Sequence, residues 1–405
     1  MSRYRTEIGL AIACLVVLGL TELKSGIYTS PSAFGSGQEV LRKAAILGLF
    51  ALGAGTVIIS GGIDLSAGSV IAFAATVFAS TCLLIASIGA ENGPDTTDLS
   101  WMTLGWATLA TLMVALAIGA FHAWLITAVN LPPFVATLAT LVGLRSIARL
   151  LIQRVDMFAR GSTSGTTKIY LYDSGFASWG SDYRVPLVTF AVFAAGLWTL
   201  LRLTVAGRHI YAVGGNETAA RLSGIRVVRV KWLVYTISSV TAAAAGILYC
   251  SYIGAATPET QGLGYELNAI AAAVVGGCGL AGGTGGVVGI ALGALFLTLV
   301  IDLVAKLAPG LSGSQSQLEG SVVGLLVILA VALNELWGRS SQTRLFAGPL
   351  GLVAIGLLTV LGGLVVSLFS ESDPLRNGLV AASATMAICI ARAVQERRWD
   401  RSPSR

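Results

Sequence analysis

A single acidic residue inside a long apolar stretch is the sharpest chemical signal in this sequence. Asp64 lies in IISGGIDLSAG, between apolar runs. A charge at the centre of a membrane-spanning helix costs about 3 kcal/mol even on lenient insertion scales, so this carboxylate should face protein or water. Gly61, Gly62 and Gly68 would allow the helix to break around it. Two interpretations stay open: Asp64 lines or braces a path through a membrane, or it caps the next helix by accepting backbone N–H bonds near Ser66.

The other candidate residues do not form an enzyme or metal site. His122 and His209 are isolated, and the 5 cysteines lie in apolar segments without paired spacing, so we interpret them as small hydrophobic residues. GCGLAG at 277–282 matches the dinucleotide-binding pattern, but its flanks are apolar runs rather than a strand and an amphipathic helix. No G-x-x-x-x-G-K-[ST] motif occurs, so any energy from ATP must come from a partner.

Several further charges have structural explanations. Arg145 and Arg149 are one turn apart near the expected outer end of a helix, which favours snorkelling of both side chains to the membrane surface. Asp302 and Lys306 have the i,i+4 spacing of a helical ion pair.

The composition places these residues in a membrane protein. The chain has 405 residues, of which 55% are hydrophobic and only 11% charged, with a mean hydropathy of +0.80. Several segments exceed the roughly 18–20 apolar residues that span a bilayer. The 49 glycines suit close helix packing in lipid, and Gly285, Gly289 and Gly293 recur on one helix face. The basic residues sit in loops and tails, so the net charge of +6 indicates topology rather than nucleic-acid binding.

Apolar runs predict about twelve membrane spans with both termini inside. The first, Ile8–Leu20, resembles a signal peptide in length but lacks a small-residue cleavage site, so we expect it to be retained. The others are expected at 41–60, 67–90, 101–129, 134–152, 186–205, 232–253, 267–279, 286–305, 318–337, 346–369 and 378–394. The motif at 61–69 also has a weak echo at 276–284, as in transporters built from repeats with broken helices.

A basic polar island separates two of the expected spans. Residues 202–231 carry six cationic side chains against one acid, Glu217, which marks the cytoplasmic side of a membrane protein. Asn216 is a good N-cap and Gly224 a good terminator, so Glu217–Ser223 is predicted to be a short helix. It is either a docking element or a helical turn with only a topological role.

Four sequence blocks resemble the inner-membrane permeases of bacterial ABC sugar importers of the ribose type. They are SGGIDLSAGSVIAF, LPPFVATLATLVGLRSIA, GRHIYAVGGNETAARLSGIRV and GYELNAIAAAVVGGCGLAGGTGGVVGIALGALFL, in the family's order over roughly residues 40–335. The resemblance implies an all-α polytopic membrane protein of about 10–12 transmembrane helices with a cytoplasmic coupling helix that sits in a groove of an ATPase. The chain departs from the family at His122-Ala123, where an Asn-Gly pair is usual, and at Asn268, where an Asp is usual.

The resemblance also implies the site residues. The residues that contact the ATPase are expected in the short helix and directly before it. The residues that line the transport path are expected near the glycine-rich breaks in the membrane helices. The expected ATPase contacts are Gly215, Asn216, Glu217, Thr218, Arg221 and Leu222, and the path candidates are Asp64, Ser66 and Asn268.

The leading functional hypothesis is therefore a permease subunit that imports a monosaccharide, a ribose-like pentose or a hexose. It implies an ATPase partner that carries ATP and Mg²⁺, an external sugar-binding protein and a second permease subunit, identical or different, with no cofactor or metal on this chain, no nucleic acid and no enzymatic activity of its own. The expected location is the bacterial inner membrane. Alternatives are import of a nucleoside or autoinducer-like furanose, or an ion-coupled secondary carrier, which would need more acids near mid-membrane than Asp64.

The chain is expected to divide into two parts. Residues 1–340 would form the transmembrane permease domain, and residues 341–405 an additional C-terminal transmembrane hairpin with a basic tail.

Overall fold

The protein is seen in a computed structural model that describes residues 5–25, 33–88, 94–161, 163–307 and 373–399, with single residues and pairs between 320 and 370. The chain forms two compact units, Met1–Asn334 and Glu335–Arg405. The assignment of separate functions to the parts before and after residue 340 stays a prediction.

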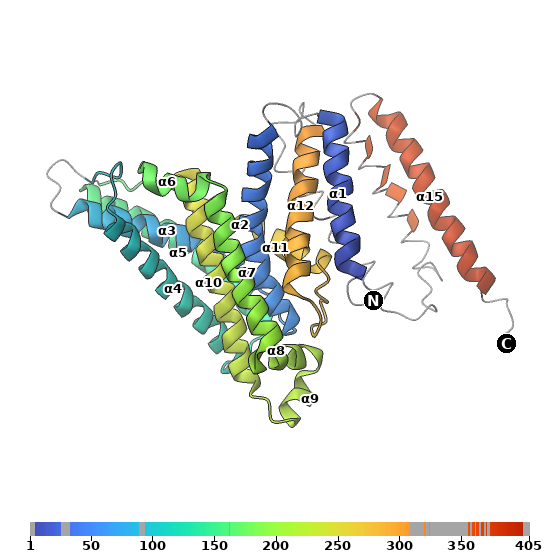
Figure 1. Ribbon diagram of the computed structural model, residues 1–405, viewed down its shortest axis with the longest axis horizontal. Helices are drawn as coiled ribbons and strands as arrows, with labels where there is room; N and C mark the ends of the chain where they lie inside the picture. Colours follow the sequence, from blue (N-terminus) through green and yellow to red (C-terminus); the bar gives the residue numbers. More distant parts are fainter. Residues whose placement is uncertain are drawn as a thin grey trace. The chain divides into compact units, whose positions relative to one another are not determined.

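The described part of the first unit is built from helices (Figure 1). It also has a two-stranded sheet. Strand β1 (Ile169–Tyr170) pairs antiparallel with β2 (Ala255–Ala256). The helices are α1 (Arg5–Ser25), α2 (Ala33–Ile59), α3 (Ala67–Ser87), α4 (Trp101–Thr127), α5 (Pro133–Arg160), α6 (Ser174–Ser181), α7 (Arg184–Leu203), α8 (Val205–Gly215), α9 (Glu217–Leu222), α10 (Val227–Ile253), α11 (Tyr265–Val275) and α12 (Val287–Leu307).

Seven helices of the described part are long and apolar enough to cross a membrane: α2, α3, α4, α5, α7, α10 and α12. They confirm seven of the predicted spans and make the chain an all-α multi-pass membrane protein. The predicted first span lies within α1, which packs along α12. The predicted spans at 318–337 and 346–369 lie outside the described ranges.

Helices α2, α3 and α10 form the packed centre of this unit. Their most apolar windows are 83%, 72% and 72% buried, against 17% for α7. Small residues allow the close approach: a Cβ on Gly246 of α10 would lie 2.8 Å from the Ile71 carbonyl oxygen of α3. Such contacts between backbones are how helices associate in lipid, where apolar burial alone gives little preference for protein over lipid. Helices α4, α5 and α7 instead expose large apolar side chains, as lipid-facing helices do.

The predicted span at 267–279 is wrong as a continuous helix. Helix α11 has 11 residues, or about 16 Å of rise, which is too short to cross a bilayer. Its helical hydrogen bonding ends at Gly276, and residues 276–286 form an irregular connection with several glycines at positive φ. Backbone of this kind is tolerated in membrane proteins where protein surrounds it.

The second unit contains α15 (Pro374–Trp399), which includes the predicted span at 378–394. The residues Leu375–Ala391 of this helix are apolar. Asn377 donates a hydrogen bond to the Ser370 hydroxyl, and Gly378 closely approaches Ser367, so α15 packs against the segment just before it.

Candidate functional site

The predicted short helix of the basic island forms as α9, one residue shorter than expected. The side chain of Asn216 accepts a hydrogen bond from the Ala219 N–H at 2.9 Å, which caps the first turn. Ser223 is the C-cap, and Gly224 follows at φ +83°, a conformation that glycine adopts without strain. Local capping residues therefore define both ends of α9.

A buried alanine and a bridging carboxylate hold α9 against its neighbours. Ala220 is 4% exposed and belongs to the main apolar core. Glu217 forms ion pairs with Arg221 on α9 at 3.0 Å and with Lys231 on α10 at 2.9 Å. Burial alone would raise the pKa of Glu217, but the hydrogen bond and charge of Lys231, together with Arg221, outweigh it and lower the pKa below its usual value. The pair with Lys231 joins α9 to the start of α10.

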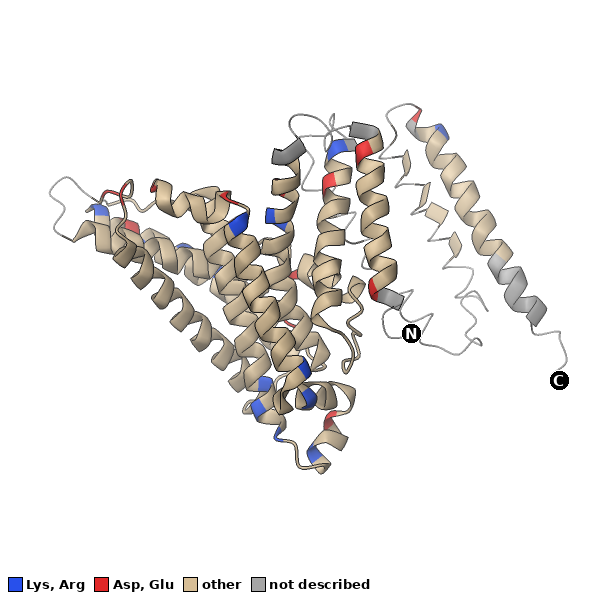
Figure 2. Ribbon diagram, in the orientation of Figure 1, with Lys and Arg blue, Asp and Glu red and all other residues tan. Residues whose placement is uncertain are grey.

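The opposite face of α9 is open. Leu222 is 85% exposed and the Arg221 side chain 71%, while Gly215, Asn216 and Thr218 are also exposed. Of the predicted contact residues, only Glu217 is half-buried, because of its ion pairs. Figure 2 shows basic residues gathered around α8, α9 and the adjoining ends of α7 and α10. An exposed leucine next to an exposed arginine offers a partner an apolar contact and a charge, and arginine is a frequent anchor residue of protein interfaces.

Helix α8 lies across the ends of the long helices and carries α9 (Figure 1). Its buried residues, Gly207, Ile210, Val213 and Gly214, recur every three or four positions and so form one face. Thr204 caps it by accepting a hydrogen bond from the Gly207 N–H. The amphipathic pattern therefore seats α8 flat against the bundle.

Asp64 forms the centre of a buried polar cluster between α3 and α10. It is 2% exposed, and its Oδ1 accepts hydrogen bonds from the Ser66 N–H at 2.9 Å and the Ser66 hydroxyl at 2.6 Å. Its Oδ2 accepts a bond from the Ser238 hydroxyl of α10 at 2.6 Å. The carboxylate thus orders the turn before α3 and ties that turn to α10.

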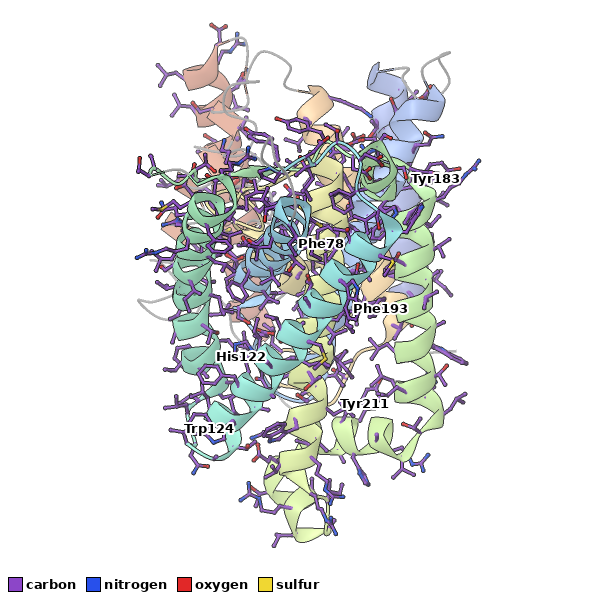
Figure 3. The ribbon with its side chains drawn as sticks, turned by 90° about the vertical axis from the view of Figure 1, so that its left-hand side faces the viewer. Phe78, His122, Trp124, Tyr183, Phe193 and Tyr211 are labelled. Atoms are coloured by element: carbon purple, nitrogen blue, oxygen red, sulfur yellow. The ribbon has the colours of Figure 1, made fainter. Side chains whose placement is uncertain are left out.

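Two threonines of α5 extend the cluster. The Leu65 N–H donates to the Thr137 hydroxyl at 3.1 Å, and His122 of α4 shares a 2.7 Å hydrogen bond with the Thr140 hydroxyl. His122 is fully buried and lies edge-on to the ring of Tyr235. Figure 3 shows His122 on the part of α4 near Trp124, well away from Phe78. His122, isolated in the sequence, is therefore a member of this cluster.

Asn268, the third path candidate, is not part of the cluster. It lies half-buried on α11, whereas the hydrogen bonds of Asp64 go to Ser66 and Ser238. Among the described residues, no group of three or more His, Cys, Asp or Glu side chains could hold a metal ion.

Comparison with known proteins identifies the family. Residues 38–331 match the family described as "Branched-chain amino acid transport system / permease component". The chain is 35% identical over 345 residues to a protein of Sinorhizobium fredii named "Probable ABC transporter permease protein", with 85% of this chain and 92% of the relative covered. The chain belongs to this family of ABC transporter permeases.

Other relatives of this permease have names that state a sugar. It is 34% identical over 303 residues to the ribose import permease of Bacillus subtilis, covering 73% of this chain and 84% of the relative. It is 29% identical over 341 residues to the galactose/methyl galactoside import permease of Escherichia coli K12, covering 82% and 95%. No solved structure is significantly similar to it. As a permease component, the chain is a transport protein and not an enzyme.

The prediction that Arg145 extends to the membrane surface is wrong. Arg145 does not snorkel: it is 8% exposed, and its Nη1 donates to the carbonyl oxygens of Pro258 at 2.8 Å and Gln261 at 2.9 Å. These carbonyls belong to the connection between β2 and α11, which is folded onto α3 and α5. Arg149, one turn later, is exposed as expected.

Proposed function

We propose that this chain is the permease subunit of an ABC importer for a monosaccharide, with α9 as the helix that docks the ATPase. The observation that carries the proposal is the construction of α9: it is capped at both ends, fixed through Ala220 and the Glu217–Lys231 pair, and open on the face with Arg221 and Leu222. An isolated connecting turn needs none of these anchors. The choice of a sugar rests on the ribose and galactose permeases among the relatives.

The proposal includes an orientation and partners. The basic residues around α8 and α9 favour the cytoplasmic side for this end of the molecule, in the bacterial inner membrane, with both chain termini on the same side. The ATPase partner binds there and carries ATP and Mg²⁺, and a sugar-binding protein and a second permease subunit complete the importer. Labelling of a cysteine at position 216 from the outside alone would contradict this orientation.

Within the membrane, we assign Asp64 and Ser66 to bracing the path and leave Asn268 as a candidate lining residue. The Asp64 carboxylate joins the turn before α3 to α10, so it can hold two helices of the path in register. The same carboxylate accepts the Ser66 N–H bond just before α3, as the capping interpretation expected, so one residue can serve both interpretations.

The test is purification of the complex followed by uptake. The tagged permease is purified with the products of neighbouring genes, reconstituted in vesicles with ATP inside, and supplied with labelled ribose, galactose or a nucleoside in the presence of its binding protein. We expect an ATPase to co-purify and one of the sugars to be taken up only with ATP. Uptake of the nucleoside instead of a sugar would show that the substrate is a nucleoside and not a monosaccharide. Uptake driven by an ion gradient without ATP would refute the assignment to an ABC importer.

A further inference from the structure

Three segments far apart in the sequence meet through their backbones beside α8. They are the end of α2 with Gly61, the C-terminal part of α8 with Gly214, and the irregular connection 276–286 between α11 and α12. The Gly283 N–H donates a hydrogen bond to the Ile59 carbonyl oxygen at 2.9 Å. We call this meeting point the glycine junction. It includes the two segments whose sequences echo one another at 61–69 and 276–284.

The glycines are required by contact between backbones. A Cβ on Gly214 would overlap the Ile59 carbonyl oxygen and would lie 2.6 Å from the Gly283 nitrogen. A Cβ on Gly282 would lie 2.9 Å from the Gly61 Cα, and Gly282 also has φ +88°. No side chain therefore separates α8 from the end of α2 or from the connection 276–286.

A tyrosine adds a second tie from the same helix. The Tyr211 hydroxyl donates to the Gly285 carbonyl oxygen at 2.9 Å. Tyr211 and Gly214 are three residues apart, so both lie on the face of α8 that meets the connection. Figure 3 labels Tyr211 on α8, at the end of the bundle that carries α9.

These contacts connect α9, through α8, to the interrupted segment formed by α11, the connection 276–286 and α12. Helix α8 continues into α9 through Asn216 alone, and the connection 276–286 continues into α12 and follows α11. Closely packed backbone atoms have little room to deform, so a displacement of α8 is passed on rather than absorbed. Building on the proposed function, we propose that Tyr211 and Gly214 are positioning residues that transmit ATP-driven movement of α9 to α11 and α12.

Two single substitutions test the glycine junction. Tyr211→Phe removes the hydroxyl that bonds the Gly285 carbonyl oxygen and adds no atoms, while Gly214→Ala forces the backbones apart. The matched controls are Tyr172→Phe, at an exposed tyrosine, and Gly196→Ala on α7, where an added Cβ has no atom within 4 Å. Each protein is purified with its ATPase and reconstituted, and three quantities are measured: the ATPase retained, the rate of ATP hydrolysis, and the solute transported per ATP hydrolysed.

We expect both junction variants to keep the ATPase and hydrolyse ATP, because the exposed face of α9 is unchanged. Transport per ATP should fall at least about fivefold, the lower range of typical coupling between sites, while both controls stay at the wild-type ratio. If Gly214→Ala does not fold, the transport per ATP of Tyr211→Phe still tests the proposal. The proposed role of the glycine junction would be wrong if Tyr211→Phe and any folded Gly214→Ala protein transported as much solute per ATP as the wild type. It would also be wrong if both variants lost the ATPase. In both cases the proposed function itself would stand. A wild-type chain that retains no ATPase would refute the proposed function and the junction with it.

Discussion

At the scale of single residues, the Asp64 carboxylate accepts hydrogen bonds from three buried groups. Replacing it by alanine leaves the Ser66 N–H and the Ser66 and Ser238 hydroxyls without their acceptor, and each buried group left unsatisfied costs about 1–3 kcal/mol. Asp64→Asn keeps a carbonyl acceptor and the side-chain shape but removes the charge. We expect Asp64→Ala to lower transport more than membrane insertion, and Asp64→Asn, which keeps one of the two acceptor oxygens, to lower transport and stability less than Asp64→Ala does. Uptake per inserted protein in vesicles is the measurement. Normal transport at normal expression in both variants would leave helix capping as the sole role.

Arg145 gives a second residue-scale prediction. Its guanidinium donates to two carbonyl oxygens of the connection between β2 and α11, and hydrogen bonds to charged groups contribute about 1.5–3 kcal/mol. Arg145→Met should therefore lower the thermal unfolding midpoint in detergent clearly, since buried carbonyls lose their donor. Arg149→Met, at an exposed arginine one turn away, should change the stability by less than about 0.5 kcal/mol. Equal midpoints for the two variants would show that the buried contact contributes nothing.

At the scale of elements, the sequence predicts α9 almost completely because its ends depend on local residues. Asn216 accepts its N–H bond three residues on, and Gly224 provides the positive φ after the helix. The burial of Arg145 could not be predicted in this way, because the carbonyl oxygens that accept its hydrogen bonds lie more than a hundred residues later in the chain. Similarly, the hydropathy of 267–279 does not reveal that α11 ends at Val275. The next residue, Gly276, packs so closely on Gly289 of α12 that only glycine fits there.

The ion pairs of Glu217 predict how α9 responds to pH. The pKa of Glu217 is lowered in the folded protein below its ordinary 4.5, so its contribution to stability is present above that value and is lost as the pH falls through the lower, folded pKa. Amide hydrogen exchange in α9, corrected for its intrinsic pH dependence, should therefore lose protection on acidification below about pH 4.5. Glu217→Gln should show the weaker protection already at neutral pH and little further change. Protection that is independent of pH in the wild type would contradict the anchoring of α9 by Glu217.

At the scale of the whole molecule, the family match covers residues 38–331, and the second unit, Glu335–Arg405, follows it. We predict that the permease core binds its ATPase without this extension. Truncation after Arg339 should leave a folded protein that still co-purifies with the ATPase at the wild-type ratio. A truncated protein that inserts normally but has lost the assembled complex would show that the extension belongs to the interface.

Membrane architecture was the most predictable property of the chain, because seven spans follow from hydropathy alone. The arrangement of the polar side chains inside the bundle could not be predicted from the sequence. His122 carries no sequence pattern that places it beside Thr140 and Tyr235; only the packing of α4 against α5 and α10 does so. Likewise, the echo between 61–69 and 276–284 is weak as a sequence signal, yet Gly61 and Gly282 meet in the structure.

The central claim, that α9 docks an ATPase, is tested most directly by the double variant Arg221→Glu with Leu222→Ala. Both side chains are exposed and neither joins the core, so insertion should be unchanged, and thermal stability should fall only by the loss of the exposed Arg221–Glu217 pair, about 0.5 kcal/mol. Loss of an interface anchor of this kind costs about 2 kcal/mol or more, which weakens binding roughly 30-fold. The measurement is the amount of ATPase retained by the purified variant and its ATP hydrolysis in vesicles. We predict that the partner and the stimulated hydrolysis are lost from a normally inserted protein; wild-type retention and hydrolysis would show that α9 is only a connector.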